Sequence, residues 1–139
     1  MILLEQFKKY ISSNNLFSPG DKLLVAVSGG VDSVVLCELC RQAGFDFGIA
    51  HCNFQLRNAD SERDENFVGA LAKKCNVAFH TIRFDTKRIA GERKISVQET
   101  ARDLRYGWFE EIRKSAGYGF ILTAHHACPV RSALPRWRV

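Results

Sequence analysis

Apolar residues follow two different patterns along this chain. In some stretches they form short unbroken runs, such as residues 23–27, and in others they recur every three or four residues. The first pattern is typical of a buried strand and the second of an amphipathic helix. We therefore expect strands at residues 22–27, 46–52, 77–84 and 119–124, and helices at 2–13, 33–43, 61–75 and 96–115. Because apolar strands alternate with helices, the sequence predicts an α/β fold, a parallel sheet with helices on both faces.

Two of the expected helices begin with capping signals. Ser61 is followed three residues later by Asp64, and Ser96 by Glu99, so each serine is a candidate N-cap. The residues expected to be buried are Phe67, Val68, Leu71 and Cys75 on the first of these helices, and Val97, Ala101, Leu104, Trp108 and Ile112 on the second.

Composition narrows the class of protein. With 139 residues, 46% hydrophobic and 25% charged, the chain is predicted to form one globular domain, which we place at residues 1–126. Residues 127–139 form an atypical tail with three arginines and no acid. Setting those three aside leaves 17 of the 20 basic residues against 15 acids, so the net charge of +5 is only weak support for nucleic-acid binding.

The lack of a recognisable targeting signal and the cysteine content predict a cytoplasmic protein with no membrane partner. No apolar run approaches the length of a membrane-spanning helix, and no signal-peptide pattern begins the sequence. Five cysteines, an odd number, favour free thiols in a reducing compartment. Cys37 and Cys40 have the spacing of metal ligands, but they fall in an expected helix, where core packing is favoured over metal binding.

The segment Ser28-Gly29-Gly30-Val31-Asp32-Ser33 joins the first expected strand to a helix. Its glycines let the backbone approach a ligand closely, and we expect Gly30 to adopt a positive φ. The amides at the start of the helix then favour an anion such as a phosphate chain. Neither the Walker A lysine nor the GxGxxG spacing is present. The alternative is an ordinary helix start capped by Asp32 or Ser33.

This segment resembles the SGGxDS loop of the N-type ATP pyrophosphatases, the PP-loop enzymes, which split ATP between the α and β phosphates. The resemblance implies a Rossmann-like fold with strand order 3-2-1-4-5, and ATP and Mg²⁺ as cofactors. It also implies a role for Asp32 in catalysis and as a magnesium ligand. The residues it implies for binding the cofactor are Ser28, Gly29, Gly30, Val31, Asp32 and Ser33.

Three further segments resemble the bacterial tRNA(Ile)-lysidine synthetases. They are His51-Cys52-Asn53-Phe54-Gln55-Leu56-Arg57 with the acidic stretch that follows, residues 98–106, and Thr123-Ala124-His125-His126. The resemblance covers roughly residues 20–126 and implies a ligase that converts the wobble cytidine of tRNA(Ile) to lysidine. An adenylated base would be the intermediate, and AMP and pyrophosphate the products. The implied partners are tRNA(Ile) and free L-lysine.

Within this family resemblance, five residues are further site candidates. Arg102 and Arg105 would supply positive charge to the phosphates as catalytic residues. Ala50, His51 and Asn53, at the carboxyl end of the second strand, would form the wall of the adenosine pocket. Two alternatives stay open: a surface pair between Glu99 and Arg102, and a His51 that is simply packed at the end of its strand.

The sequence departs from the resembled family after His126. Family members continue with an acidic stretch, HHxDDxxET, whereas residues 127–139 contain no acid. We therefore expect strand order 3-2-1-4 with the fifth strand missing, a chain that is inactive as it stands, and a homodimer formed through the edge of the fourth strand. The alternative functions are another PP-loop enzyme, such as a tRNA thiolation enzyme, or a non-catalytic remnant that binds ATP.

Overall fold

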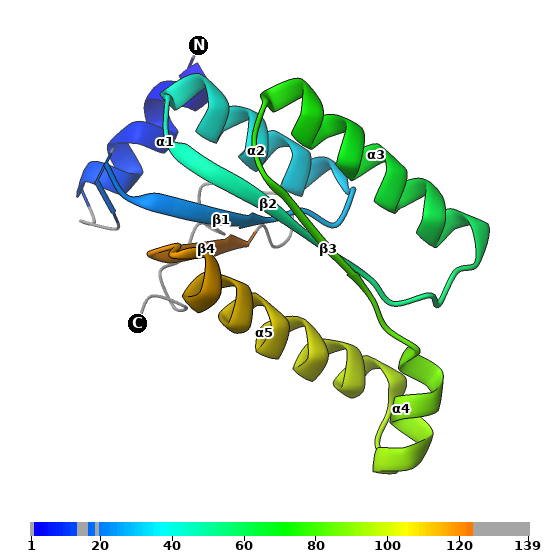
Figure 1. The fold of residues 1–139 in the computed structure, drawn as a ribbon. Helices are drawn as coiled ribbons and strands as arrows, with labels where there is room; N and C mark the ends of the chain where they lie inside the picture. The colour runs from blue at the N-terminus through cyan, green and yellow to red at the C-terminus, as the bar shows by residue number, and fades with distance from the viewer. Residues whose placement is uncertain (1, 14–16, 19, 124–139) are drawn as a thin grey trace.

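Four parallel strands form a single sheet in a computed structural model that describes residues 2–13, 17–18 and 20–123 (Figure 1). The strands are β1 (Lys22–Ala26), β2 (Asp46–Asn53), β3 (Phe79–Arg83) and β4 (Phe120–Thr123). The helices are α1 (Ile2–Ser13), α2 (Val31–Ala43), α3 (Ala59–Cys75), α4 (Thr86–Arg93) and α5 (Val97–Ala116). Strand order is β3-β2-β1-β4, and every pair is parallel, which confirms the predicted order.

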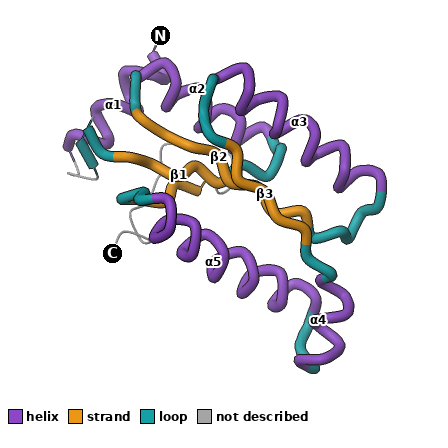
Figure 2. Tube along the Cα trace, in the orientation of Figure 1, coloured by secondary structure: helices purple, strands orange, loops and turns teal. Residues whose placement is uncertain are grey.

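Helices cover both faces of the sheet, as Figure 2 shows: α1, α2 and α3 lie on one side and α5 on the other. The alternation of side chains along β1 explains why both faces are apolar. Leu23 and Val25 belong to the core beneath α1 and α2, whereas Leu24 packs with Trp108 of α5 on the opposite face. A strand buried on both sides needs the unbroken apolar run that the sequence contains.

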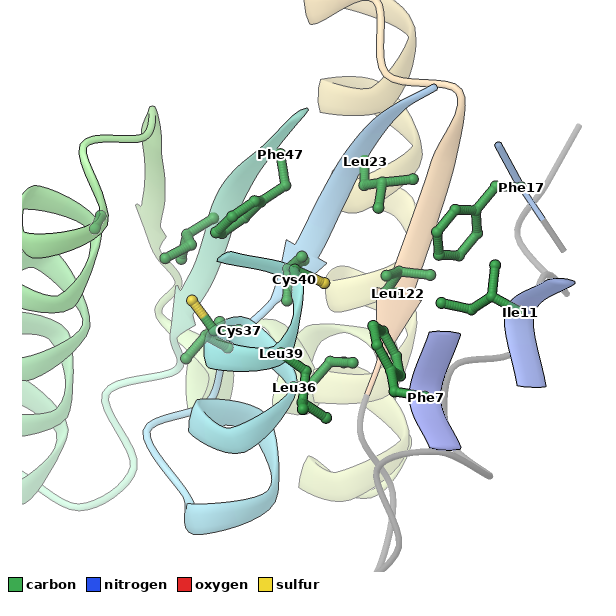
Figure 3. Packing of buried hydrophobic residues seen from close by; sticks show 14 of the residues in the cluster. Phe7, Ile11, Phe17, Leu23, Leu36, Cys37, Leu39, Cys40, Phe47 and Leu122 are labelled. Atoms are coloured by element: carbon green, nitrogen blue, oxygen red, sulfur yellow. The ribbon is translucent and has the colours of Figure 1, made fainter. Parts of the chain in front are cut away.

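The larger core joins α1 and α2 to the sheet (Figure 3). Phe7 and Ile11 of α1 point toward Leu122 of β4, and Leu36 of α2 lies beside them. Cys37 and Cys40 are fully buried in the same cluster, which confirms their prediction as core residues. Within the described residues no group of three or more metal-ligating side chains occurs.

Helix α4 was not predicted, and two predicted helices begin earlier than expected. The sequence of α4 is mostly polar and contains a glycine, and only Thr86 and Ala90 are buried, so it has no apolar stripe. Helix α2 begins at Val31 rather than residue 33, and α3 begins at Ala59 rather than residue 61. In both cases the helix starts ahead of its first buried position, which is Ser33 in α2 and Val68 in α3.

One capping signal is confirmed and the other is wrong. The Ser96 side chain accepts a hydrogen bond from the Glu99 amide at 3.0 Å, as a capping residue should. In α3 the N-cap is Asn58, at φ 50°, and Ser61 lies inside the first turn, where its hydroxyl accepts a hydrogen bond from the Arg57 amide.

The predicted buried faces of α3 and α5 need correction. Phe67 is 49% exposed, although Val68 beside it is buried. On α5, Ala101 and Trp108 are buried as predicted, whereas Val97, Leu104 and Ile112 are only half-buried. The buried stripe lies partly on the neighbouring positions Thr100, Phe109 and Arg113.

Several predictions fall on residues 124–139, which lie outside the described residues. They concern the tail at 127–139, the double histidine and the missing fifth strand. Across the described part of the chain, no helix is long and apolar enough to cross a membrane.

Candidate functional site

A cavity of about 720 Å³ opens at the carboxyl ends of the strands. Its lining includes Val27 just after β1, Ala50 and His51 near the end of β2, and Thr123 at the end of β4. Strand β1 lies between β2 and β4. The chain adds β2 and β3 on one side of β1 and then crosses back to add β4 on the other side, which makes this position a topological switch point. Ligands in open parallel sheets bind in the crevice that such a switch point creates. The cavity is therefore where the fold favours a ligand.

The glycine turn between β1 and α2 forms one wall of this cavity. Ser28, Gly29, Gly30 and Ser33 all line it. Gly29, at φ +102°, has the conformation that only glycine adopts easily, whereas Gly30 is at φ −75°. The expectation of a positive φ at Gly30 is therefore wrong by one residue.

Helix α2 begins at this turn without a side-chain cap. Its N-cap is Gly30, which has no side chain to accept the first amide protons, so the capping role proposed for Asp32 or Ser33 does not occur. The Ser33 hydroxyl instead donates to the Gly30 carbonyl at 2.9 Å. The Ser28 hydroxyl accepts from the Gly30 amide at 3.2 Å. The serines thus hold the turn in shape, and the helix keeps the uncapped, positive end that attracts an anion.

His51 of β2 also lines the cavity and is 3% exposed. Its Nδ1 lies 2.8 Å from the Val27 carbonyl oxygen, which ties β2 to β1 immediately before the glycine turn. Its Nε2 is the one buried side-chain nitrogen or oxygen of the described residues that lacks a hydrogen-bond partner. The imidazole is packed at the strand end and also presents an unused polar atom.

Asn53 lines the cavity, but its side-chain amide is hydrogen-bonded to other protein groups. Its Nδ2 donates to Glu65 at 3.2 Å, and its Oδ1 accepts from the Gln55 amide at 2.9 Å. Arg83 donates two hydrogen bonds to the same carboxylate, which together with Asn53 holds the pKa of Glu65 below its usual value. Asn53 therefore fixes the loop after β2 to α3 and β3.

The two candidate arginines are placed differently. Arg105 lines the cavity, its guanidinium carbon 5.1 Å from the centre of the Phe54 ring, and within the described residues it forms no ion pair. Arg102 is exposed, lies 5.5 Å from the Tyr106 ring centre, and is not among the described residues that line the cavity. Of these two arginines, Arg105 is the one among the described lining residues, so it brings a positive charge to the cavity.

Two carboxylates lie near the turn. Asp32, in the first turn of α2, is half-buried and is not among the described lining residues, and neither is Val31, which is 78% exposed. Asp64 of α3 does line the cavity, where it pairs with Arg57. The Asp64 side chain packs against the turn, because a Cβ built on Gly29 would meet it at 3.5 Å.

Sequence reasoning missed several lining residues as individual site residues. They are Cys52, Phe54, Leu56, Arg57, Asp64, Tyr106 and Phe109. Most lie in the segments that carried the family resemblance, so those segments were the available signal. Burial raises the pKa of Cys52 to about 12, which leaves its thiol protonated and unreactive.

The PP-loop domain family matches residues 2–128 of the chain. The chain therefore belongs to the PP-loop domain family, whose members use ATP. Among curated proteins, it is 48% identical over 118 residues to a tRNA(Ile)-lysidine synthase of Bacteroides thetaiotaomicron and 44% identical over 126 residues to one of Porphyromonas gingivalis. These alignments cover 85% and 90% of this chain but 28% of each relative, so the chain spans less than a third of their length.

A solved structure supports the fold alone. An NH3-dependent NAD synthetase from Campylobacter jejuni, in complex with a nitrate ion, superposes with a TM-score of 0.60 at 14% sequence identity. The match covers 88% of this chain and 53% of that chain.

Proposed function

We propose that the cavity binds ATP, with the phosphates on the turn at residues 28–33 and the adenosine along the end of β2. One observation carries this proposal: the glycine turn, the uncapped start of α2 and the unpaired Arg105 all border one cavity. Backbone amides and a guanidinium are the donors that phosphate oxygens prefer. Ala50 and His51 line the same cavity from β2, and we propose that they contact the nucleoside.

Mg²⁺ fits this cavity only when the phosphates of the nucleotide supply part of its ligands. Mg²⁺ is usually held by one or two carboxylates together with substrate phosphates, so a complete protein cage is not needed. Asp32, half-buried beside the turn and with no ion pair among the described residues, is the proposed ligand. When bound, the ion would neutralise charge on the phosphates.

The reaction we propose for the whole protein is that of its relatives, tRNA(Ile)-lysidine synthase. The wobble cytidine of tRNA(Ile) would be adenylated by ATP, and free L-lysine would then displace AMP. In this reaction the turn would hold the leaving pyrophosphate, and Arg105 would stabilise its charge. By itself this chain is proposed to bind ATP without forming lysidine, because residues 127–139 lack the acids of the resembled family.

A sulfur-transferring PP-loop enzyme is supported less well. Such chemistry needs a reactive thiolate near the nucleotide. Cys52 is the one cysteine among the described lining residues, and burial raises the pKa of its thiol. Cys37 and Cys40 lie in the core, and burial raises the pKa of each of them as well.

Arg105→Met is expected to weaken ATP binding by about 10- to 150-fold, because a hydrogen bond to a charged group contributes about 1.5–3 kcal/mol. Arg105→Lys should recover only part of the loss, since lysine cannot form a bidentate contact with phosphate. Calorimetric titration of ATP into each variant measures the effect.

Arg102→Met is the matched control on the same helix. Because Arg102 lies outside the described lining, its loss should change ATP affinity by less than about threefold. Equal losses at the two positions would place both arginines on the phosphates, and no loss at Arg105 would contradict the proposed orientation of the nucleotide.

A further inference from the structure

The partner of His51 Nδ1 fixes the tautomer of this side chain. Nδ1 lies 2.8 Å from the Val27 carbonyl oxygen, and a carbonyl oxygen can only accept a hydrogen bond. The proton of the neutral imidazole therefore sits on Nδ1. Nε2 then carries a lone pair and can only accept.

That acceptor is buried and unused, and it belongs to a residue that lines the cavity. His51 is 3% exposed, and Nε2 has no hydrogen-bond partner among the described residues. A buried polar atom without a partner costs about 1–3 kcal/mol, so such atoms are rare unless a ligand completes them. The carboxylate of Glu65 is already engaged by Arg83 and Asn53, and an acceptor could not bond to Nε2 in any case.

We infer that His51 is a specificity-determining residue whose Nε2 accepts a hydrogen bond from an N–H or O–H donor on the nucleoside part of the bound nucleotide. This inference rests on the proposed function, because it requires ATP in the cavity. The α and β phosphates carry no proton at neutral pH and the γ phosphate is largely deprotonated, so the phosphates are poor donors. In ATP the candidate donors are the 2′ and 3′ hydroxyls of the ribose and the 6-amino group of adenine.

Nucleotide analogues identify the donor in the unmodified chain. Affinity is measured by calorimetry for ATP, 2′-deoxy-ATP, 3′-deoxy-ATP and purine riboside triphosphate, which lacks the 6-amino group. One analogue should bind about tenfold more weakly than ATP, since it leaves Nε2 without its donor. If all three bind as ATP does, the inference is overturned while the ATP site stands. If ATP itself does not bind, both the proposed function and this inference fail.

Two substitutions of His51 distinguish the acceptor role of Nε2 from the structural hydrogen bond between Nδ1 and the Val27 carbonyl. An asparagine amide can take the place of Nδ1 and donate to Val27, but it leaves nothing at Nε2. A glutamine amide reaches the position of Nε2 and can accept there. In His51→Asn, ATP should bind about tenfold more weakly and the discrimination between ATP and the sensitive analogue should vanish. In His51→Gln, part of that discrimination should return.

An equal loss for ATP and every analogue in His51→Asn would show that His51 acts only through the fold, which overturns the inference. A direct readout does not depend on either variant folding. Nitrogen NMR of the histidine-labelled chain should show a proton on Nδ1 of His51, and the Nε2 resonance should move when ATP is added. A proton on Nε2 instead would contradict the assignment.

Discussion

Gly48→Ala is expected to destabilise the fold by about 3 kcal/mol, at the upper end of what overpacking a core costs. A Cβ at this position in β2 would lie 2.0 Å from the Tyr118 hydroxyl oxygen and 2.8 Å from its ring carbon Cζ. Tyr118 cannot move aside easily. It is buried, its hydroxyl is 2.9 Å from His80 Nε2, and Lys22 Nζ lies 4.7 Å from its ring centre.

Urea unfolding followed by circular dichroism measures this loss, and two variants control it. Gly107→Ala, in the exposed part of α5 where nothing lies within 4 Å of the new Cβ, should stabilise the fold by up to about 1 kcal/mol. Combining Gly48→Ala with Tyr118→Leu, which removes the clashing ring, should cost clearly less than the sum of the single changes. Strictly additive losses would rule out the clash as the cause.

Gly29→Ala is expected to weaken ATP binding by about 5- to 150-fold, which corresponds to about 1–3 kcal/mol for an unfavourable backbone conformation. At φ +102° an alanine is strained, and relief of that strain would change the shape of the turn that receives the phosphates. The same strain should lower the free energy of unfolding by a similar amount when ATP is absent.

Gly30→Ala provides the neighbouring control for Gly29→Ala. Gly30 is at φ −75°, and a Cβ there would meet only the Ser28 hydroxyl at an ordinary 3.5 Å. Its free energy of unfolding should fall by no more than about 1 kcal/mol, the cost of an alanine at an N-cap. Identical unfolding curves for the two alanine variants would contradict the assignment of the strained position to Gly29.

The sheet could be predicted from the sequence because its signal is repeated and unambiguous. Each strand is an apolar run, and the helices between them force a parallel arrangement. The strand order, by contrast, came from the family resemblance. Helix α4 escaped prediction because its few buried positions, Thr86 and Ala90, form no apolar stripe. Phe67 was misplaced because periodicity cannot distinguish the buried centre of a helix face from its exposed edge.

The candidate site was predictable in composition and less so in geometry. The family resemblance selected the turn, His51 and Arg105, which line one cavity in the structure. It did not distinguish Arg105 from Arg102, which lies outside the described lining. Which of the two glycines tolerates no side chain depends on its φ, and φ depends on how the turn enters α2. The acceptor role of His51 was also beyond the sequence, since it depends on a hydrogen bond to Val27, 24 residues earlier in the chain.

The most direct test of ATP binding in this cavity is a calorimetric titration of ATP into the chain, with and without saturating pyrophosphate. Phosphates seated on the turn at residues 28–33 predict that pyrophosphate competes with ATP and abolishes most of the binding signal. The parent chain should bind ATP, and Gly29→Ala should bind it more weakly while keeping its circular dichroism spectrum. Absence of ATP binding, or ATP binding that pyrophosphate does not affect, would contradict a phosphate site on this turn.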